Sequence, residues 1–119
     1  MCLPTVAEGD QIRAGLAMQM VAVATGVPPA RMIAHVRQGP QVNRARWLSM
    51  YLTHVGFGWP VERVGHAFGF NRCTVATACR WAEDVRERPE IDRLIERMEA
   101  AIRDLCEAPA LVLPTEARA

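Results

Sequence analysis

The sequence contains no membrane-length apolar run, no phosphate-binding glycine loop and no lysine. The longest apolar stretch, residues 16–27, is interrupted by Gln19, Thr25 and Gly26, so no membrane span is expected. Glu8 and Asp10 occupy the region where a secretory signal would be basic. The GxxxxGK[ST] pattern of nucleotide-driven proteins is also missing. These absences predict a cytoplasmic protein that does not use nucleotide hydrolysis.

Metal, redox and catalytic motifs are missing as well. The four cysteines, at positions 2, 73, 79 and 106, form no CxxC pair and no Cys/His set at zinc spacing. They are expected to be reduced thiols, with Cys79 and Cys106 in the core. The histidines, His35, His54 and His66, have no acidic or nucleophilic partner at catalytic spacing. We therefore expect no metal, no cofactor and no enzymatic activity.

Charge is distributed unevenly along the chain although its net value is only +1. Residues 31–80 contain seven arginines against the single acid Glu62, which gives +6. Residues 81–119 contain six arginines against ten acids, which gives −4. A basic block of this kind is typical of a DNA-binding face. The use of arginine alone has a simpler explanation in a gene rich in G and C, so no function is drawn from it.

The length of 119 residues fits one domain, and the apolar periodicity is helical throughout. We expect an all-α fold of about six helices, residues 10–107, between a flexible arm, residues 1–9, and a tail, residues 108–119. The first helix should bury the face that carries Ile12, Leu16, Met20 and Val23. The helices are expected at residues 10–25, 28–36, 44–54, 60–68, 71–87 and 89–107, with an arginine-rich connection before the third.

Residues 62–80, ERVGHAFGFNRCTVATACR, contain the most informative pattern. Two apolar helical stripes are separated by a turn at Gly69 and Phe70, a pattern that is typical of a helix-turn-helix. Asn71 is suited to N-cap the second helix, and Arg72 and Thr74 would then project from its first turn. The alternative is a plain packing unit of two short helices, which also occurs around a glycine turn.

From Arg46 onward, residues 46–69 and 71–80 resemble the C-terminal DNA-binding domain of the bacterial replication initiator DnaA. The resemblance is weaker back to about residue 22 and forward to about residue 105, and the turn after Gly69 is one residue short. The matching positions are Arg46, Met50, Leu52, Gly65, Phe68, Gly69, Thr74, Val75, Ala78, Cys79 and Arg80.

The resemblance implies a docking mode on double-stranded DNA. In that family the arginine matching Arg46 enters the minor groove, whose negative potential attracts arginine, while the helix-turn-helix occupies the adjacent major groove. Arg44 stands beside it. The alternative is that these are solvated loop arginines.

The base-reading positions depart from the family. Asn71 and Arg72 stand where the family has Asp and His, and their geometries favour adenine and guanine respectively. Cys73 replaces a threonine, so the recognised sequence is expected to differ. Asn71 is alternatively occupied by capping alone. The expected DNA-binding residues are Arg44, Arg46, Val61, Arg63, Asn71, Arg72, Cys73, Thr74, Thr77 and Arg80.

Val61 and Glu62 occupy the positions of a Leu-Pro pair that approaches the phosphate backbone in the family. A carboxylate does not suit phosphate contact, so the neighbouring Arg63 is expected to make it instead.

These features predict a sequence-specific transcriptional regulator, located on the nucleoid, with its oligomeric state left open. Free-standing domains of this kind also resemble the DNA-binding half of activators of gene-transfer-agent clusters, which implies RNA polymerase or a sigma-like protein as partner. The apolar tail residues Leu111, Val112 and Leu113 are the expected docking site, unless the tail is disordered or folds back. The alternative function is an interaction module that competes at replication-initiator boxes.

Overall fold

The computed structural model describes residues 6–108 and 110–116. Within these residues the chain forms six helices and no strand, so the expected all-α fold is confirmed. The helices are α1 (Val6–Thr25), α2 (Pro29–Met32), α3 (Pro40–Phe57), α4 (Val61–Phe68), α5 (Arg72–Val85) and α6 (Pro89–Glu107). The first helix thus begins inside the expected arm, and residues 1–5 lie outside the described part.

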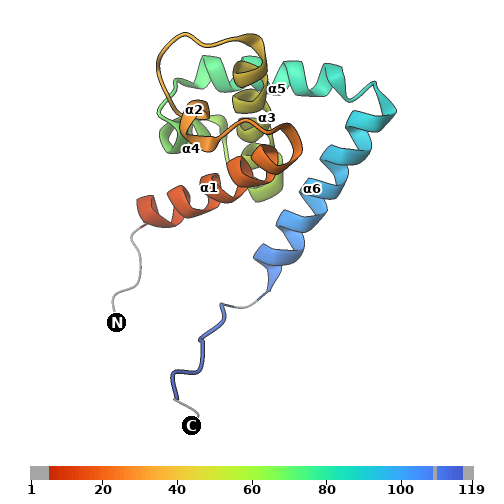
Figure 1. Cartoon of the computed structure of the whole chain (residues 1–119). Coiled ribbons are helices and arrows are strands. Elements are labelled where there is room, and N and C mark those ends of the chain that lie inside the picture. Colours follow the sequence, from red (N-terminus) through yellow and green to blue (C-terminus); the bar gives the residue numbers. More distant parts are fainter. Residues whose placement is uncertain (1–5, 109, 117–119) are drawn as a thin grey trace.

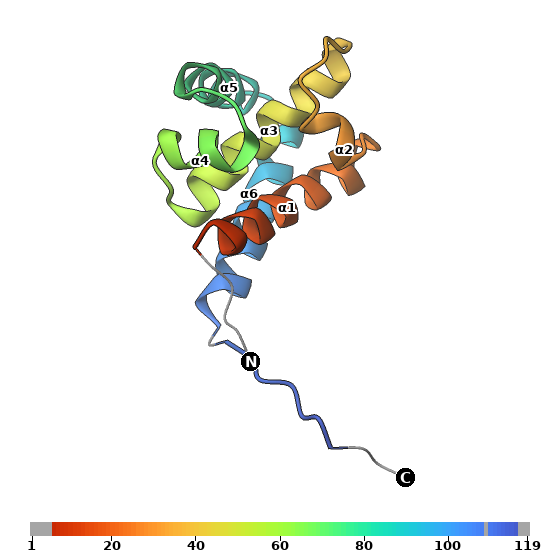
Figure 2. The ribbon, with the colours of Figure 1, turned by 90° about the vertical axis from the view of Figure 1, so that its left-hand side faces the viewer.

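Helix α3 is the centre of the domain and contacts all five other helices (Figure 2). Its side chains Met50 and Leu52 are fully buried. Two polar residues, Ser49 and Thr53, are buried with them, and their hydroxyls donate to the carbonyls of Ala45 and Ser49 one turn earlier. The core therefore accepts these hydroxyls without leaving a donor unpaired.

Proline begins three of the helices. Pro29, Pro40 and Pro89 each occupy the first helical turn, where the missing N–H costs no hydrogen bond. The break expected at Gly39-Pro40 is therefore the N-terminus of α3, which begins four residues earlier than expected. As a consequence, Arg44 and Arg46 belong to α3. The prediction of an arginine-rich connection at these residues is therefore wrong. The second helix is shorter than expected and ends at Met32.

Helix α1 buries a different face from the one expected. Its buried residues are Ala14, Ala17, Met18 and Val21, whereas Ile12 and Val23 are exposed. Small alanine side chains allow α1 to approach α3 closely, and this close packing outweighs the larger apolar area of the other stripe. The apolar stripe that was expected to face the core therefore lies partly in solvent.

Helix α6 packs on α3 through Ile95, Met98 and Ile102 and then runs out beyond the other helices (Figure 1). Gly56 of α3 makes this packing close, because a Cβ there would lie 3.0 Å from the side chain of Ile102. Cys106, near the free end of α6, is exposed, so its expected core position is wrong. The described tail residues continue away from the bundle, with Leu111, Val112 and Leu113 exposed.

Candidate nucleic-acid interface

The turn between α4 and α5 places α5 close against α4. The carbonyl of Gly65 accepts the N–H groups of both Gly69 (2.8 Å) and Phe70 (2.9 Å). Gly69 has a φ of +77°, which favours glycine, and it ends α4 as the sequence predicts. A Cβ on Gly65 would lie 2.5 Å from the carbonyl oxygen of Phe70. The carbonyl of Phe70 can therefore lie this close to α4 only with glycine at position 65.

Asn71 caps α5, as predicted. Its Oδ1 accepts the N–H of Thr74 at 2.9 Å and the hydroxyl of Thr74 at 3.1 Å. The cap therefore uses the amide oxygen of Asn71 and the hydroxyl of Thr74. The two amide N–H groups of Asn71, whose side chain is exposed, take no part in the cap.

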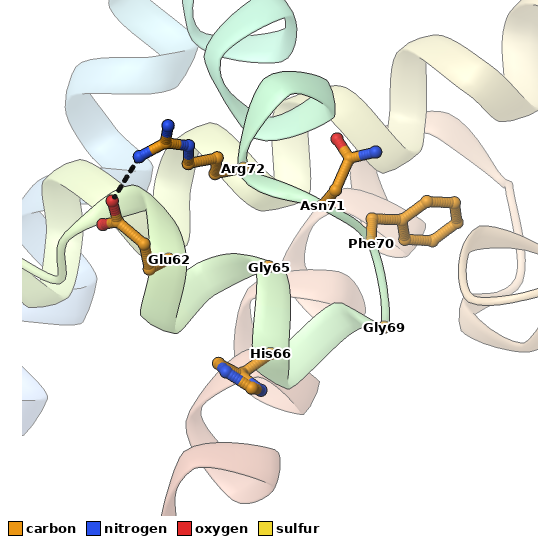
Figure 3. A pocket seen from close by; sticks show the side chains of 7 residues that line it. All are labelled: Glu62, Gly65, His66, Gly69, Phe70, Asn71 and Arg72. Atoms are coloured by element: carbon orange, nitrogen blue, oxygen red, sulfur yellow. Dashed lines mark ion pairs between the residues drawn. The ribbon is translucent and has the colours of Figure 1, made fainter.

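Arg72 extends from the first turn of α5 across to α4 (Figure 3). Its Nη1 lies 3.6 Å from Oε1 of Glu62, and its side chain is 70% exposed. The pair borders a shallow hollow of about 420 Å³ in front of α5, which Gly65, His66 and Phe70 also line. The structure thus brings the predicted base-reading arginine together with the one acid of the basic block.

Further along α5, an outward row continues from Cys73 through Thr77 to Arg80, all three exposed. The hydroxyl of Thr77 donates to the carbonyl of Cys73 (3.0 Å) and accepts from Nη2 of Arg80 (3.3 Å). This places the guanidinium of Arg80 over the same face of α5. Arg72, Cys73, Thr77 and Arg80 form one exposed surface, here called the α5 face.

Arg44 is exposed beside this helix. Its guanidinium lies over the ring of Trp47 at 4.4 Å and 5.7 Å from the ring of Trp81, which belongs to α5. Stacking on an aromatic face leaves the in-plane N–H groups of an arginine free to donate. Arg44 is therefore placed as a cation next to the α5 face.

Arg46 is not exposed, which corrects its expected place in the minor groove. Its side chain is only 9% exposed, with Nε donating to the carbonyl of Met32 (2.5 Å) and Nη2 to that of Ala34 (2.8 Å). Its guanidinium also lies 4.7 Å from the ring of Phe70, and burial lowers its pKa. Because α3 begins at Pro40, Arg46 points inward and joins α2, α3 and the turn.

Arg63 is likewise already engaged. It donates to both carboxylate oxygens of Asp10, at 2.9 and 2.7 Å, and lies over the ring of Trp59. The hydrogen bond from Arg63 lowers the pKa of Asp10 and raises that of Arg63. This pair ties α4 to α1 and pairs the charge of Arg63 with that of Asp10, so Arg63 is not a free cation where a phosphate contact was expected. Val61, beside it, is half-buried.

The sequence interpretation missed Arg31 and Arg37, which are both exposed. Arg37 lies in the loop between α2 and α3, and His35 of that loop stacks on Phe70 of the turn, with ring centroids 4.3 Å apart. The loop is thereby held against the α4–α5 turn. Both arginines were counted in the basic block. Because a helix was expected to extend to Val36, the loop between α2 and α3 was not predicted at its full length.

Other kinds of site find little support. Among residues 6–108 and 110–116, no group of three His, Cys, Asp or Glu side chains could hold a metal ion. None of the helices in that part is both long and apolar enough to cross a membrane. Comparisons with protein-family models, curated proteins and solved structures find no match to this chain.

Proposed function

We propose that α4, the turn and α5 form a helix-turn-helix that binds double-stranded DNA, and that the protein regulates transcription. The observation that carries this proposal is the α5 face, where Arg72, Thr77 and Arg80 are exposed together on one short helix. Arg44 stands beside that helix, and Arg37 lies in the loop held against the turn. Cations and hydrogen-bond donors in this arrangement suit phosphates and base edges.

The polarity of α5 favours entry of its N-terminal end into the major groove. Residues 72–80 of this helix carry Arg72 and Arg80 and no acid, whereas residues 81–85 carry Glu83 and Asp84. Phosphates attract the first of these segments and repel the second. In this proposal Arg72 reads bases and Arg80 contacts phosphate. Arg37 takes the role expected of Arg46, since it is the exposed arginine of the adjoining loop.

The acidic part of the molecule lies elsewhere. Figure 1 places α5 at one end of the molecule and the free end of α6 with the tail at the other. We propose that this far end, with Leu105, Leu111, Val112 and Leu113 exposed, contacts RNA polymerase or a sigma-like protein while α5 holds DNA. Deletion of residues 108–119 should leave DNA affinity unchanged and lower transcriptional output from a target promoter. Parallel loss of both would show that the tail serves the fold.

Selection of bound sequences from a random duplex library tests the proposal directly. A site distinct from the replication-initiator box supports a regulator with its own target, because Asn71 and Arg72 differ from the family residues. Recovery of the initiator box itself would favour the alternative function, a module that competes at those boxes. No enrichment of any sequence would contradict specific DNA binding.

The salt dependence of affinity tests which charges are in the interface. With about four to six phosphates contacted, log K should fall against log salt with a slope of roughly −4 to −5. The double variant R72A/R80A should reduce this slope by about one, because Arg80 is the phosphate contact of the two. The control R93A/R97A removes two exposed arginines of α6 and should leave the slope unchanged. A wild-type slope shallower than about −2 would exclude the basic block from the interface.

A further inference from the structure

Glu62 is the only acid among residues 31–80, yet it lies beside the arginine proposed to read bases. Its side chain is 57% exposed, and that of Arg72 is 70% exposed. An exposed ion pair of this kind contributes little to stability. Glu62 lies in the first turn of α4, where a carboxylate is slightly stabilising. It also opposes the approach of phosphates, so general DNA affinity does not explain it.

The chemistry of a G·C base pair matches this pair of side chains. In the major groove guanine presents the acceptors N7 and O6, and cytosine presents the donor N4–H₂ next to O6. A guanidinium is the preferred partner of guanine, and a carboxylate accepts from cytosine N4. Arg72 and Glu62 hold these two groups side by side, with 3.6 Å between Nη1 and Oε1.

We propose that Glu62 and Arg72 together recognise one G·C base pair, Arg72 through guanine and Glu62 through cytosine. The proposal rests on the proposed DNA binding by α5. Glu62 comes from the first turn of α4 and Arg72 from the first turn of α5, and both side chains line the hollow that Gly65 also borders. In Figure 3 the side chain of His66 points away from the pair, which leaves the two charged groups facing each other.

Glu62 then determines specificity mainly by penalising wrong sequences. Where thymine or guanine replaces cytosine, the carboxylate meets a base acceptor, O4 or O6. Where adenine replaces it, Glu62 still finds a donor in N6–H₂, but Arg72 then faces thymine and loses the two acceptors of guanine. Removal of the carboxylate should therefore raise affinity for random DNA while it weakens the preference for G·C. A residue that served only affinity would change both kinds of DNA binding in the same direction.

The test compares E62Q and E62A with E87Q, which removes an equal charge from the exposed turn between α5 and α6. Affinities of the folded full chain are measured for the selected site, for that site with each G·C pair inverted or replaced, and for a random duplex. For both Glu62 variants, we expect discrimination at one G·C position to fall about tenfold and random-duplex affinity to rise. E87Q should keep the wild-type discrimination.

Three results would overturn the inference. If wild type prefers a sequence and both Glu62 variants keep every base preference, Glu62 reads nothing, although the proposed function stands. If E87Q changes discrimination as much as E62Q, net charge is the cause rather than contact with cytosine. If the wild-type protein prefers no sequence at all, the proposed function fails and this inference fails with it.

Discussion

The two ends of α5 each have an arginine, in opposite settings. At the N-terminal end, Arg72 is 70% exposed and has one ion pair, at 3.6 Å. At the C-terminal end, Arg86 is only 18% exposed and donates to Asp92 (2.6 Å), to the hydroxyl of Tyr51 (3.0 Å) and to Glu99. Arg86 therefore stabilises the fold, whereas Arg72 remains exposed and can contact a ligand. Sequence alone does not separate them, because their partners come from other helices.

The Arg86 cluster fixes the direction in which α6 leaves α5. Burial opposes the charge of Arg86, but its hydrogen bonds with Asp92, Tyr51 and Glu99 outweigh that effect and raise its pKa. Burial, together with the hydrogen bond to Glu83, raises the pKa of Tyr51 to about 12. Tyr51 therefore remains protonated, donates to Glu83 and accepts from Arg86. The cluster holds the acidic helix α6 away from the α5 face.

The largest effect is expected at the N-terminal end of α5, from the glycine that positions it. Gly65→Ala should lower the free energy of unfolding by about 3 kcal/mol, because its Cβ would overlap the Phe70 carbonyl oxygen. The control Gly15→Ala, which meets no atom within 4 Å, should be neutral or stabilising. Denaturant unfolding measures both. Equal stability of the two variants would show that the turn relaxes without cost.

The second largest effect is expected from loss of Arg86 at the C-terminal end of α5. Arg86→Ala should destabilise the fold by about 2 to 3 kcal/mol, since it leaves Asp92, Glu99 and the Tyr51 hydroxyl without their shared donor. Arg93→Ala, at an exposed arginine of α6, should change stability by less than about 0.5 kcal/mol. Thermal and denaturant unfolding distinguish the two. If both variants were equally stable, the Arg86 cluster would not stabilise the junction between α5 and α6.

Arg72 should show the reverse behaviour. Arg72→Ala should leave stability within about 0.5 kcal/mol of wild type but weaken binding to the selected site by about 1 to 3 kcal/mol and relax base preference there. Arg46→Ala should instead destabilise the fold, because Arg46 supports the carbonyls of Met32 and Ala34. Equal losses of Arg72→Ala on selected and random duplexes would mean that Arg72 contacts only phosphate.

The smallest effect concerns the Asp10–Arg63 pair, which joins α1 to α4. Because the folded-state pKa of Asp10 is lowered, its contribution to stability is complete above the ordinary aspartate value near 3.9. That contribution is lost as pH falls through the lower folded value. Asp10→Asn should therefore be less stable than wild type at neutral pH, and the difference should shrink below about pH 4. A difference independent of pH would assign the effect to packing rather than charge.

Local signals explain what the sequence predicts correctly. Gly69 ends α4 and Asn71 caps α5 through neighbours at most four residues away, so both can be recognised in the chain. Arg46 and Arg63 cannot be interpreted in this way. Asp10 is 53 residues from Arg63 in the sequence. The carbonyls that accept from Arg46 lie at and just beyond the end of α2, which the sequence pattern predicts to end several residues later. Which arginines remain exposed is decided by these tertiary partners.

The same limit applies to α1. Periodicity identifies the helix, but two of its faces are apolar and either could face the core. Hydrophobicity alone predicts that the face with the larger side chains is buried. Close contact with α3 selects Ala14 and Ala17 instead. Ile12 and Val23 are exposed for this reason, which no local signal in the sequence indicates.

Because α3 contacts every other helix, the domain has no subset of helices that could fold around a separate core. We expect one cooperative unfolding transition, with the slowest amide hydrogen exchange at the buried centre of α3, near Met50 and Leu52. Exchange at those amides should require global opening. A substitution that loosens α3 would then shorten the lifetime of the native α5 face and of the α6 orientation together.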